Sequence, residues 1–228
     1  MSTVELLVQT LIQQDDARPR TQATGIGPSS LGGCARKVAL DLLGAHKPNA
    51  QVERFASIKG TAIHEAIERA FVAHLDPEEE QTEITLPGIP ALRINDGHAD
   101  LYRKSLGRIV DWKTTLKKSL RYFPGTHRLW QTMTYGYMAR SAGLEVREVE
   151  IVAIPLDGQS TDIASWVLPY DERVVEQAFD WQRGVLSRVE AIEHTGDLDY
   201  LPPPDRPRHT FCAPYCPYYG PDSCPGRP

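Results

Sequence analysis

Apolar residues in the first third of the chain recur at helical spacing. The pattern predicts a short amphipathic helix over residues 3–16, a second helix from Ser29 or Ser30 to about Leu43, and a third over residues 58–75. The third helix has the clearest apolar stripe, which consists of Ile63, Ala66, Ile67 and Ala70. The N-terminal part of the chain is therefore expected to be helical.

After these helices the apolar spacing changes to the alternation that is typical of strands. The predicted strands are Thr82–Leu86, Asp96–Tyr102, Arg108–Lys113, Arg147–Ile154 and Ile163–Leu168, and two further helices are predicted over residues 127–142 and Asp171–Glu193. We expect an α/β fold in which a central mixed sheet is flanked by helices.

The length of 228 residues favours one domain with extensions. Residues 1–27 form an N-terminal helix and loop, residues 28–200 form the core, and residues 201–228 form a C-terminal tail. The tail is rich in proline, has little apolar content, and is expected to have no regular structure. Something other than a hydrophobic core must therefore order it.

The composition is ordinary for a globular protein in water, with 41% hydrophobic and 24% charged residues. No apolar run approaches the roughly 20 residues that span a bilayer, and the first residues do not form a signal peptide. We expect a cytoplasmic protein that has no membrane partner and whose thiols stay reduced.

The formal net charge of −5 argues against a protein that coats nucleic acid indiscriminately. It does not exclude DNA as a substrate, because acidic residues that hold divalent ions add to the negative count. A local basic strip also exists, and it consists of Lys113, Lys117, Lys118, Arg121, His127 and Arg128. By itself this strip could equally be a solvated surface.

The chain has four cysteines, and three of them lie close to its C-terminus. Cys212, Cys216 and Cys224 have the spacing C-x3-C-x7-C, whereas Cys34 lies far away in the predicted second helix. Reduced, clustered thiols favour a metal over disulfides. Thiolates suit both zinc and iron–sulfur clusters, and the spacing alone does not separate the two.

A second candidate site lies on the predicted strands. Asp111 and Lys113 are two residues apart, so in a strand their side chains point to the same face. Asp100, near the end of the preceding strand, supplies a second carboxylate. Two carboxylates and a backbone carbonyl, here that of Trp112, suit Mg2+ or Mn2+. Lysine beside a metal-bound water can help to form the nucleophile and can neutralise phosphate charge. An isolated Asp-x-Lys pair, however, occurs by chance in many proteins.

Four motifs follow one another in a particular order, namely Gly60-Thr-Ala-Ile-His64-Glu, Gly97-x-x-Asp100, Asp111-x-Lys113 and Gln131-Thr-Met-Thr-Tyr135. This ordered set resembles the RecB-like branch of the PD-(D/E)xK nuclease superfamily. One cysteine before the core and three after it, with Ser29-Ser-Leu-Gly-Gly-Cys34-Ala-Arg-Lys, resemble the iron–sulfur-clamped members, which include CRISPR-associated protein family four and the AddB-type recombination nucleases. The resemblance spans roughly residues 28–226. The tail departs from the commoner family spacing of C-x2-C-x5-C.

The resemblance implies a restriction-endonuclease-like core and a metal-dependent DNA exonuclease that acts on single-stranded ends. It implies that His64, Asp100, Asp111 and the Trp112 carbonyl ligate Mn2+ or Mg2+, and that Lys113 is catalytic. Gln131 would orient Lys113 or the substrate phosphate, and Tyr135 would support the DNA strand. The four cysteines, Cys34, Cys212, Cys216 and Cys224, would hold a structural [4Fe-4S] cluster.

The same resemblance implies partner proteins in recombination, in CRISPR adaptation, or with a helicase motor, and it leaves an oligomer open. The chain contains no P-loop motif, so a motor would be a separate chain. Two alternatives have a different function. One is a catalytically silent subunit that binds DNA ends or serves in assembly, and the other is a zinc-binding interaction module.

Overall fold

The computed structural model describes residues 2–17, 25–49, 52–206, 208–220 and 224–226. Its sheet has five strands in the order β1-β2-β3-β4-β5, with bounds Glu80–Leu86, Gly97–Arg103, Arg108–Thr115, Glu148–Pro155 and Ala164–Pro169. All neighbours are antiparallel except β3 and β4, which are parallel. The sheet is therefore mixed, as predicted.

The parallel pair requires a crossover, and helix α4 (Gly125–Ser141) supplies it. The tight turn between β2 and β3 contains Gly107, whose φ of 57° lies in the left-handed region that glycine adopts without strain. Helix α5 (Glu172–Thr195) begins at Asp171, whose side chain caps Arg173 N, and ends at Gly196 in the left-handed conformation. These ends agree with the predicted ones to within about two residues.

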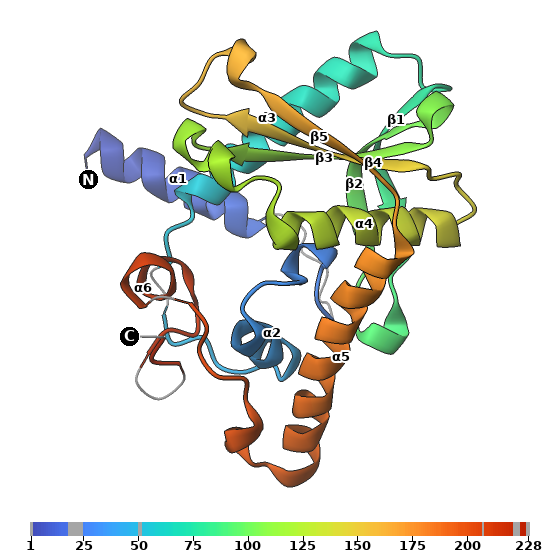
Figure 1. The fold of residues 1–228 in the computed structure, drawn as a ribbon. Helices are drawn as coiled ribbons and strands as arrows, with labels where there is room; N and C mark the ends of the chain where they lie inside the picture. The colour runs from blue at the N-terminus through green and yellow to red at the C-terminus, as the bar shows by residue number, and fades with distance from the viewer. Residues whose placement is uncertain (1, 18–24, 50–51, 207, 221–223, 227–228) are drawn as a thin grey trace.

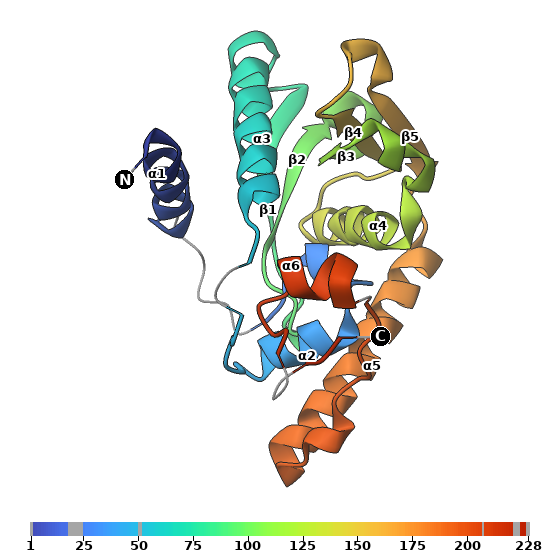
Figure 2. The same cartoon turned by 90° about the vertical axis from the view of Figure 1, so that its left-hand side faces the viewer.

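Helices cover both faces of the sheet (Figures 1 and 2). Helix α4 packs on one face, where the main core continues into α5. Helix α3 (Phe55–His74) packs on the other face, where Ile67 and Phe71 contact a small cluster around Val110 and Trp112. No helix within the described residues is long and apolar enough to cross a membrane.

The predicted apolar stripe of α3 is only partly correct. Ile63 and Ile67 are partly buried, whereas Ala66 and Ala70 are exposed. The side that contacts the sheet runs through Ile67 and Phe71, which lie four residues apart, and the Phe71 and Trp112 ring centroids are 5.3 Å apart. Small alanines carry too little apolar area to decide which side of a helix is buried.

The predicted start of the second helix at Ser29 or Ser30 is wrong. Residues Pro28–Ser30 form a separate 3-10 turn, and helix α2 (Ala35–Leu42) begins after Cys34, its N-cap residue. Between them Gly32 has a φ of 70°, and a Cβ there would lie 2.9 Å from the Trp130 ring. The close approach to Trp130 needs a glycine, and this bend interrupts the helical period.

The tail is more ordered than expected. It contains a turn of π-helix at Arg208–Cys212 and the short helix α6 (Ala213–Tyr215), which lies near α2 in both views (Figures 1 and 2). The Asn49 side-chain amide donates to the Ala213 and Cys216 carbonyls, both at 3.0 Å. The tail is thus held by hydrogen bonds to the N-terminal region. The division into segments 1–27, 28–200 and 201–228 remains a prediction.

Helix α1 (Thr3–Ala17) agrees with the predicted first helix. It leaves most of its apolar side chains exposed, among them Val4, Leu6 and Leu7. It therefore contributes little to the core.

Candidate active site

The candidate site lies where strands β2 and β3 separate. The last paired residues are Leu101 and Val110. Asp100 and Asp111 would form the next pair, but they are not paired. The Trp112 N–H donates instead to Asp100 Oδ2 at 2.7 Å. The carboxylate of Asp100 therefore takes the place of a β2 backbone carbonyl as the acceptor for this N–H, while β3 stays paired with β4 on its other side.

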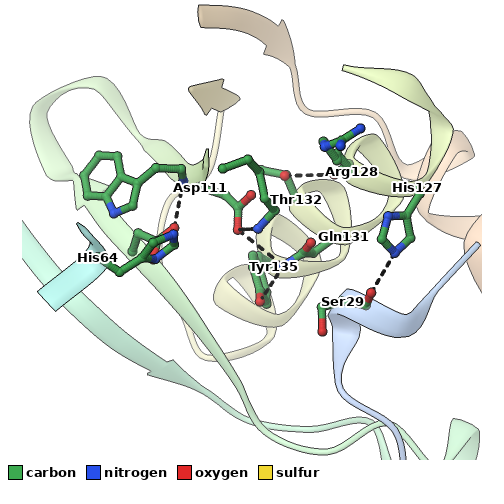
Figure 3. Close-up of polar contacts among 11 residues, drawn as sticks. Ser29, His64, Asp111, His127, Arg128, Gln131, Thr132 and Tyr135 are labelled. Carbon is green, nitrogen blue, oxygen red and sulfur yellow. Dashed lines mark hydrogen bonds and ion pairs between the residues drawn. The ribbon is translucent and has the colours of Figure 1, made fainter. Parts of the chain in front are cut away.

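Asp111 is the most buried acidic residue of the site, with 2% of its surface exposed. Its Oδ1 accepts from Lys113 Nζ at 2.6 Å and from Gln131 Nε2 at 3.3 Å. Gln131 Nε2 also donates to the Tyr135 hydroxyl at 2.9 Å (Figure 3). The predicted pair on β3 thus meets the Gln-x-x-x-Tyr pair of α4.

Burial raises the pKa of Asp111 to about 6, although the Lys113 ammonium opposes this shift. Burial also raises the pKa of the Tyr135 hydroxyl. Asp111 Oδ2 and Gln131 Oε1 are both buried and have no hydrogen-bond partner among the described residues. Two buried acceptors without donors are costly, and they are suited to a cation or to a ligand that donates hydrogen bonds.

His64 approaches the same place from α3, on the opposite face of the sheet from α4. Its Nδ1 lies 2.9 Å from Asp100 Oδ1. The hydrogen bond to Asp100 raises the pKa of His64, because the carboxylate stabilises the charged ring. Trp112 packs its ring against Phe71, so its contribution to the site is through its backbone.

The sequence leaves open whether Glu83 adds an outer contact to the site, and the structure places it at the same cavity. It would pair with Asp100 in a regular β1–β2 ladder, but its φ of 48° is left-handed and the ladder omits that pair. Burial, and secondarily the Asp100 charge, raises the pKa of Glu83. Backbone strain of this kind concentrates at functional sites. A strand pattern carries no sign of it, because Glu-Ile-Thr reads as an ordinary strand.

These side chains line one open cavity of about 510 Å³. Its walls include Ser29, Gly60, His64, Glu65, Glu68, Glu83, His98, Asp100, Asp111, Lys113, Gln131 and Tyr135. The structure therefore brings together every predicted side chain of this site. It also places Glu65 and Glu68 of α3 and Glu83 of β1 at the cavity, whose roles the sequence leaves undecided.

Carboxylate oxygens and an imidazole nitrogen are ligand types that Mn2+ or Mg2+ can accept. Asp111 Oδ2, which has no hydrogen-bond partner among the described residues, could bind such an ion without breaking a hydrogen bond. Within the described residues, however, no three His, Cys, Asp or Glu side chains form a ready metal site. Asp100 is engaged by His64 and Trp112, and Asp111 Oδ1 is engaged by Lys113. Metal binding would therefore replace some of these hydrogen bonds with bonds to the ion.

The four cysteines gather around a separate, small cavity. Cys34 comes from the start of α2, and Cys212, Cys216 and Cys224 come from the tail. All four are free thiols. Burial raises the pKa of Cys34 to about 11 and also raises the pKa values of Cys212 and Cys216. The start of α2 and the C-terminal tail therefore meet at the thiols, as the spacing suggested.

A thiolate set of this kind suits zinc and iron–sulfur clusters alike. The space lined by the thiols is about 10 Å³, which is room for roughly one water-sized group. Within the described residues the thiols do not form a group that could hold a metal ion as they stand, so either an ion or a cluster would require them to move. Asn49 and Tyr218, which hold the tail, were missed from the sequence because nothing local marks a contact between such distant residues.

Comparisons with known proteins give the fold. No family model matches the chain, and no curated protein matches it in sequence. Among solved structures, the protein SSO0001 has a TM-score of 0.54 at 18% identity, covering 86% of this chain and 89% of that one. The alkaline exonuclease LHK-Exo from Laribacter hongkongensis has a TM-score of 0.53 at 13% identity, covering 77% and 93%.

A phage-related exonuclease from Haemophilus somnus 129PT has a TM-score of 0.50 at 15% identity, covering 76% of this chain and 96% of that one. The shared fold is the PD-(D/E)xK-like fold of exonucleases, a central mixed sheet flanked by helices. The predicted fold class is therefore confirmed. At these identities the likeness extends to the fold alone.

Proposed function

We propose that this protein is a divalent-metal-dependent deoxyribonuclease that hydrolyses phosphodiester bonds at DNA ends. The observation that carries the proposal is the buried Asp111 carboxylate, which has one oxygen on Lys113 and the other without a partner among the described residues. A buried carboxylate held in this way beside a lysine, in an open cavity, is suited to catalysis. The exonuclease fold supports the same function.

A bound Mn2+ or Mg2+ ion would be held by His64, Asp100, Asp111 and the Trp112 carbonyl. The bound ion would supply an activated water and stabilise charge on the phosphate. Lys113 places its ammonium beside Asp111, where it can neutralise a phosphate oxygen. Gln131 holds Asp111 in place, and Tyr135 holds Gln131 through its hydroxyl.

The preference for single-stranded ends follows from the resemblance to RecB-like exonucleases. Action at DNA ends, though not the choice of strand, is supported by a second structure of LHK-Exo, which holds dAMP and has a TM-score of 0.52 with this chain at 14% identity, covering 75% of this chain and 90% of that one. A mononucleotide is what an exonuclease releases from an end. The cavity of about 510 Å³ has room for a group of that size.

The test is cleavage of end-labelled single-stranded and double-stranded DNA with Mn2+, with Mg2+, or with a chelator. Lys113→Ala and Asp111→Asn should each lower the rate by about 100-fold or more, which is the effect typical of removing a charge-stabilising group. Lys104→Ala is the matched control, because Lys104 is exposed at the opposite end of β3 and should cleave at the parent rate.

Parent-rate cleavage by Lys113→Ala would show that the assignment of the site is wrong. A parent protein that binds DNA ends but does not cleave them with either metal would favour the silent end-binding subunit. Thermal melting of each variant checks that folding is retained.

We further propose that Cys34, Cys212, Cys216 and Cys224 hold a structural [4Fe-4S] cluster. The convergence of all four thiols, one from the start of α2 and three from the tail, supports this, and so does the resemblance to clamped nucleases. Protein purified without oxygen should be brown and contain about four irons per chain. Stoichiometric zinc without iron would overturn this part of the proposal and leave the nuclease part standing.

A further inference from the structure

A long stretch that begins in β3 and runs through η4 and α4 contains no acidic residue. From Trp112 to Leu144 there is neither Asp nor Glu, although the whole chain has 30 of them and a net charge of −5. The basic residues of this stretch gather in the 3-10 helix η4 (Lys117–Tyr122) and in the first turn of α4. A local excess of positive charge on an acidic protein is a feature that a polyanion would recognise.

Two arginines of this stretch lie over aromatic rings rather than beside carboxylates. Arg128 lies 3.9 Å from the centroid of the Phe123 ring, and Arg121 lies 4.8 Å from that of Tyr122. Among the described residues neither forms an ion pair with a carboxylate, and the contacts of their guanidinium groups are with the rings and with the Pro124 carbonyl. Most arginines elsewhere, such as Arg108 with Glu148, have an acidic partner. Arg128 Nη1 donates one long hydrogen bond, of 3.4 Å, to the Pro124 carbonyl, and the remaining guanidinium donors of Arg121 and Arg128 can contact a ligand.

The aromatic rings are arranged in two ways. Phe123 is half-buried and stacks on Trp166 of β5, with the ring centroids 5.5 Å apart. Phe123 lies between Trp166 and Arg128, so the stacked rings fix the position of the Arg128 guanidinium. Tyr122, in contrast, is 63% exposed. One face of its ring is near Arg121, and an exposed ring of this kind can stack on an unpaired base.

The surface is continuous with the proposed active site. Helix η4 follows directly after β3, the strand of Asp111 and Lys113. Arg128 lies one helical turn before Gln131, and its backbone carbonyl accepts from Thr132 Oγ1 (Figure 3). A strand that lies on η4 would therefore lead into the cavity past Lys113.

We propose that Arg121, Tyr122 and Arg128 form a binding surface for single-stranded DNA, in which the arginines contact successive phosphates and the Tyr122 ring stacks on a base. This strand-binding surface rests on the proposed nuclease function for its purpose, but its binding chemistry does not depend on cleavage. It delivers the strand to Asp111 and Lys113. Double-stranded DNA lacks an exposed base face and gains only the phosphate contacts.

The test is binding of a labelled oligothymidylate of about 12 nucleotides, measured by fluorescence anisotropy in the presence of a chelator so that cleavage does not occur. Tyr122→Ala should weaken binding about 5-fold or more, and Tyr122→Phe should restore it, because stacking requires the ring alone. Tyr200→Ala, which removes an exposed tyrosine of η6 (Leu198–Tyr200), is the control and should bind as the parent does.

Arg121→Gln and Arg128→Gln should also weaken binding, but with a different signature. Each should reduce the slope of log Kd against log salt concentration by about 0.7, which is the value for one phosphate contact on a single strand. Tyr122→Ala should leave the slope unchanged. Arg140→Gln is the matched control, because Arg140 lies at the far end of the same helix and is also over a tyrosine ring, 4.8 Å from the centroid of Tyr170.

Parent-like affinity and salt slope in the Tyr122→Ala, Arg121→Gln and Arg128→Gln variants would overturn the strand-binding surface, even if Lys113→Ala shows that the protein is a nuclease. Conversely, weakened binding in these variants of a protein that never cleaves DNA would support the surface and reject the nuclease. Equal losses for single-stranded and double-stranded probes in Tyr122→Ala would also contradict the stacking contact.

Discussion

The active-site cavity and the cysteine site are built in opposite ways. The cavity is assembled on neighbouring strands and on the helices that pack directly against them, and its side chains are bonded to one another. The cysteine site is assembled from one residue before the core and three residues of a tail that has no core of its own. Its four thiols are free and are not bonded to one another.

The two sites are therefore expected to contribute differently to the stability of the fold and to its activity. The sheet would persist without a metal in the cavity, because Ile109, Val149 and the other core residues do not depend on Asp111. The tail has fewer contacts of its own, chiefly the amide of Asn49 and the buried Tyr218. We therefore expect changes in the cavity to alter activity, and changes in the cysteine site to alter folding.

The largest expected effect is that of Cys34→Ser. Loss of this ligand should remove most of the iron and lower Tm by about 5 °C or more, since about 2 kcal/mol corresponds to roughly 4–8 °C in a chain of this size. Asp111→Asn provides the contrast and should melt no lower than the parent, because it removes a buried charge. Iron analysis and thermal melting measure both. A Cys34→Ser protein that retains its iron and its Tm would contradict the contrast.

A smaller effect is expected of Gln131→Leu, which leaves Asp111 Oδ1 with Lys113 as its remaining donor. Cleavage should fall about 10-fold or more and metal affinity should fall with it, as is typical when an outer hydrogen bond to a metal ligand is lost. The iron content should not change. Tyr135→Phe, which removes only the hydroxyl that accepts from Gln131, should show a lesser loss. Both effects are measured as cleavage rates over a titration of the metal. Parent-like metal affinity in Gln131→Leu would show that Gln131 does not support the metal ligand Asp111.

The smallest effect is expected in the tail. Tyr218 is fully buried, and its hydroxyl donates to Asp41 Oδ1 at 2.8 Å. Tyr218→Phe should lower the free energy of unfolding by about 1 kcal/mol and leave cleavage unchanged. The control is Tyr215→Phe, since Tyr215 lies in the same tail but is 52% exposed. Denaturant unfolding measures the difference. Equal stabilities of the two variants would mean that Tyr218 does not anchor the tail.

Several features could be predicted from the sequence because their causes are local. The alternation along β3 places Asp111 and Lys113 on one face whatever surrounds the strand. The four-residue interval between Gln131 and Tyr135 likewise places them one turn apart on α4. The ends of α5 follow from Asp171 and Gly196, whose capping preferences depend on a few adjacent residues.

Other features were decided by the tertiary structure alone. The Asp100 carboxylate contacts the Trp112 N–H with one oxygen and His64 of α3 with the other, which requires β2, β3 and α3 to have packed together. The left-handed Glu83 and the contact between Gly32 and Trp130 are conformations that neighbours in space impose. The anchoring of the tail by Asn49 joins residues 164 positions apart. Short-range spacing carries none of this information, because each of these contacts forms only when remote segments have packed together.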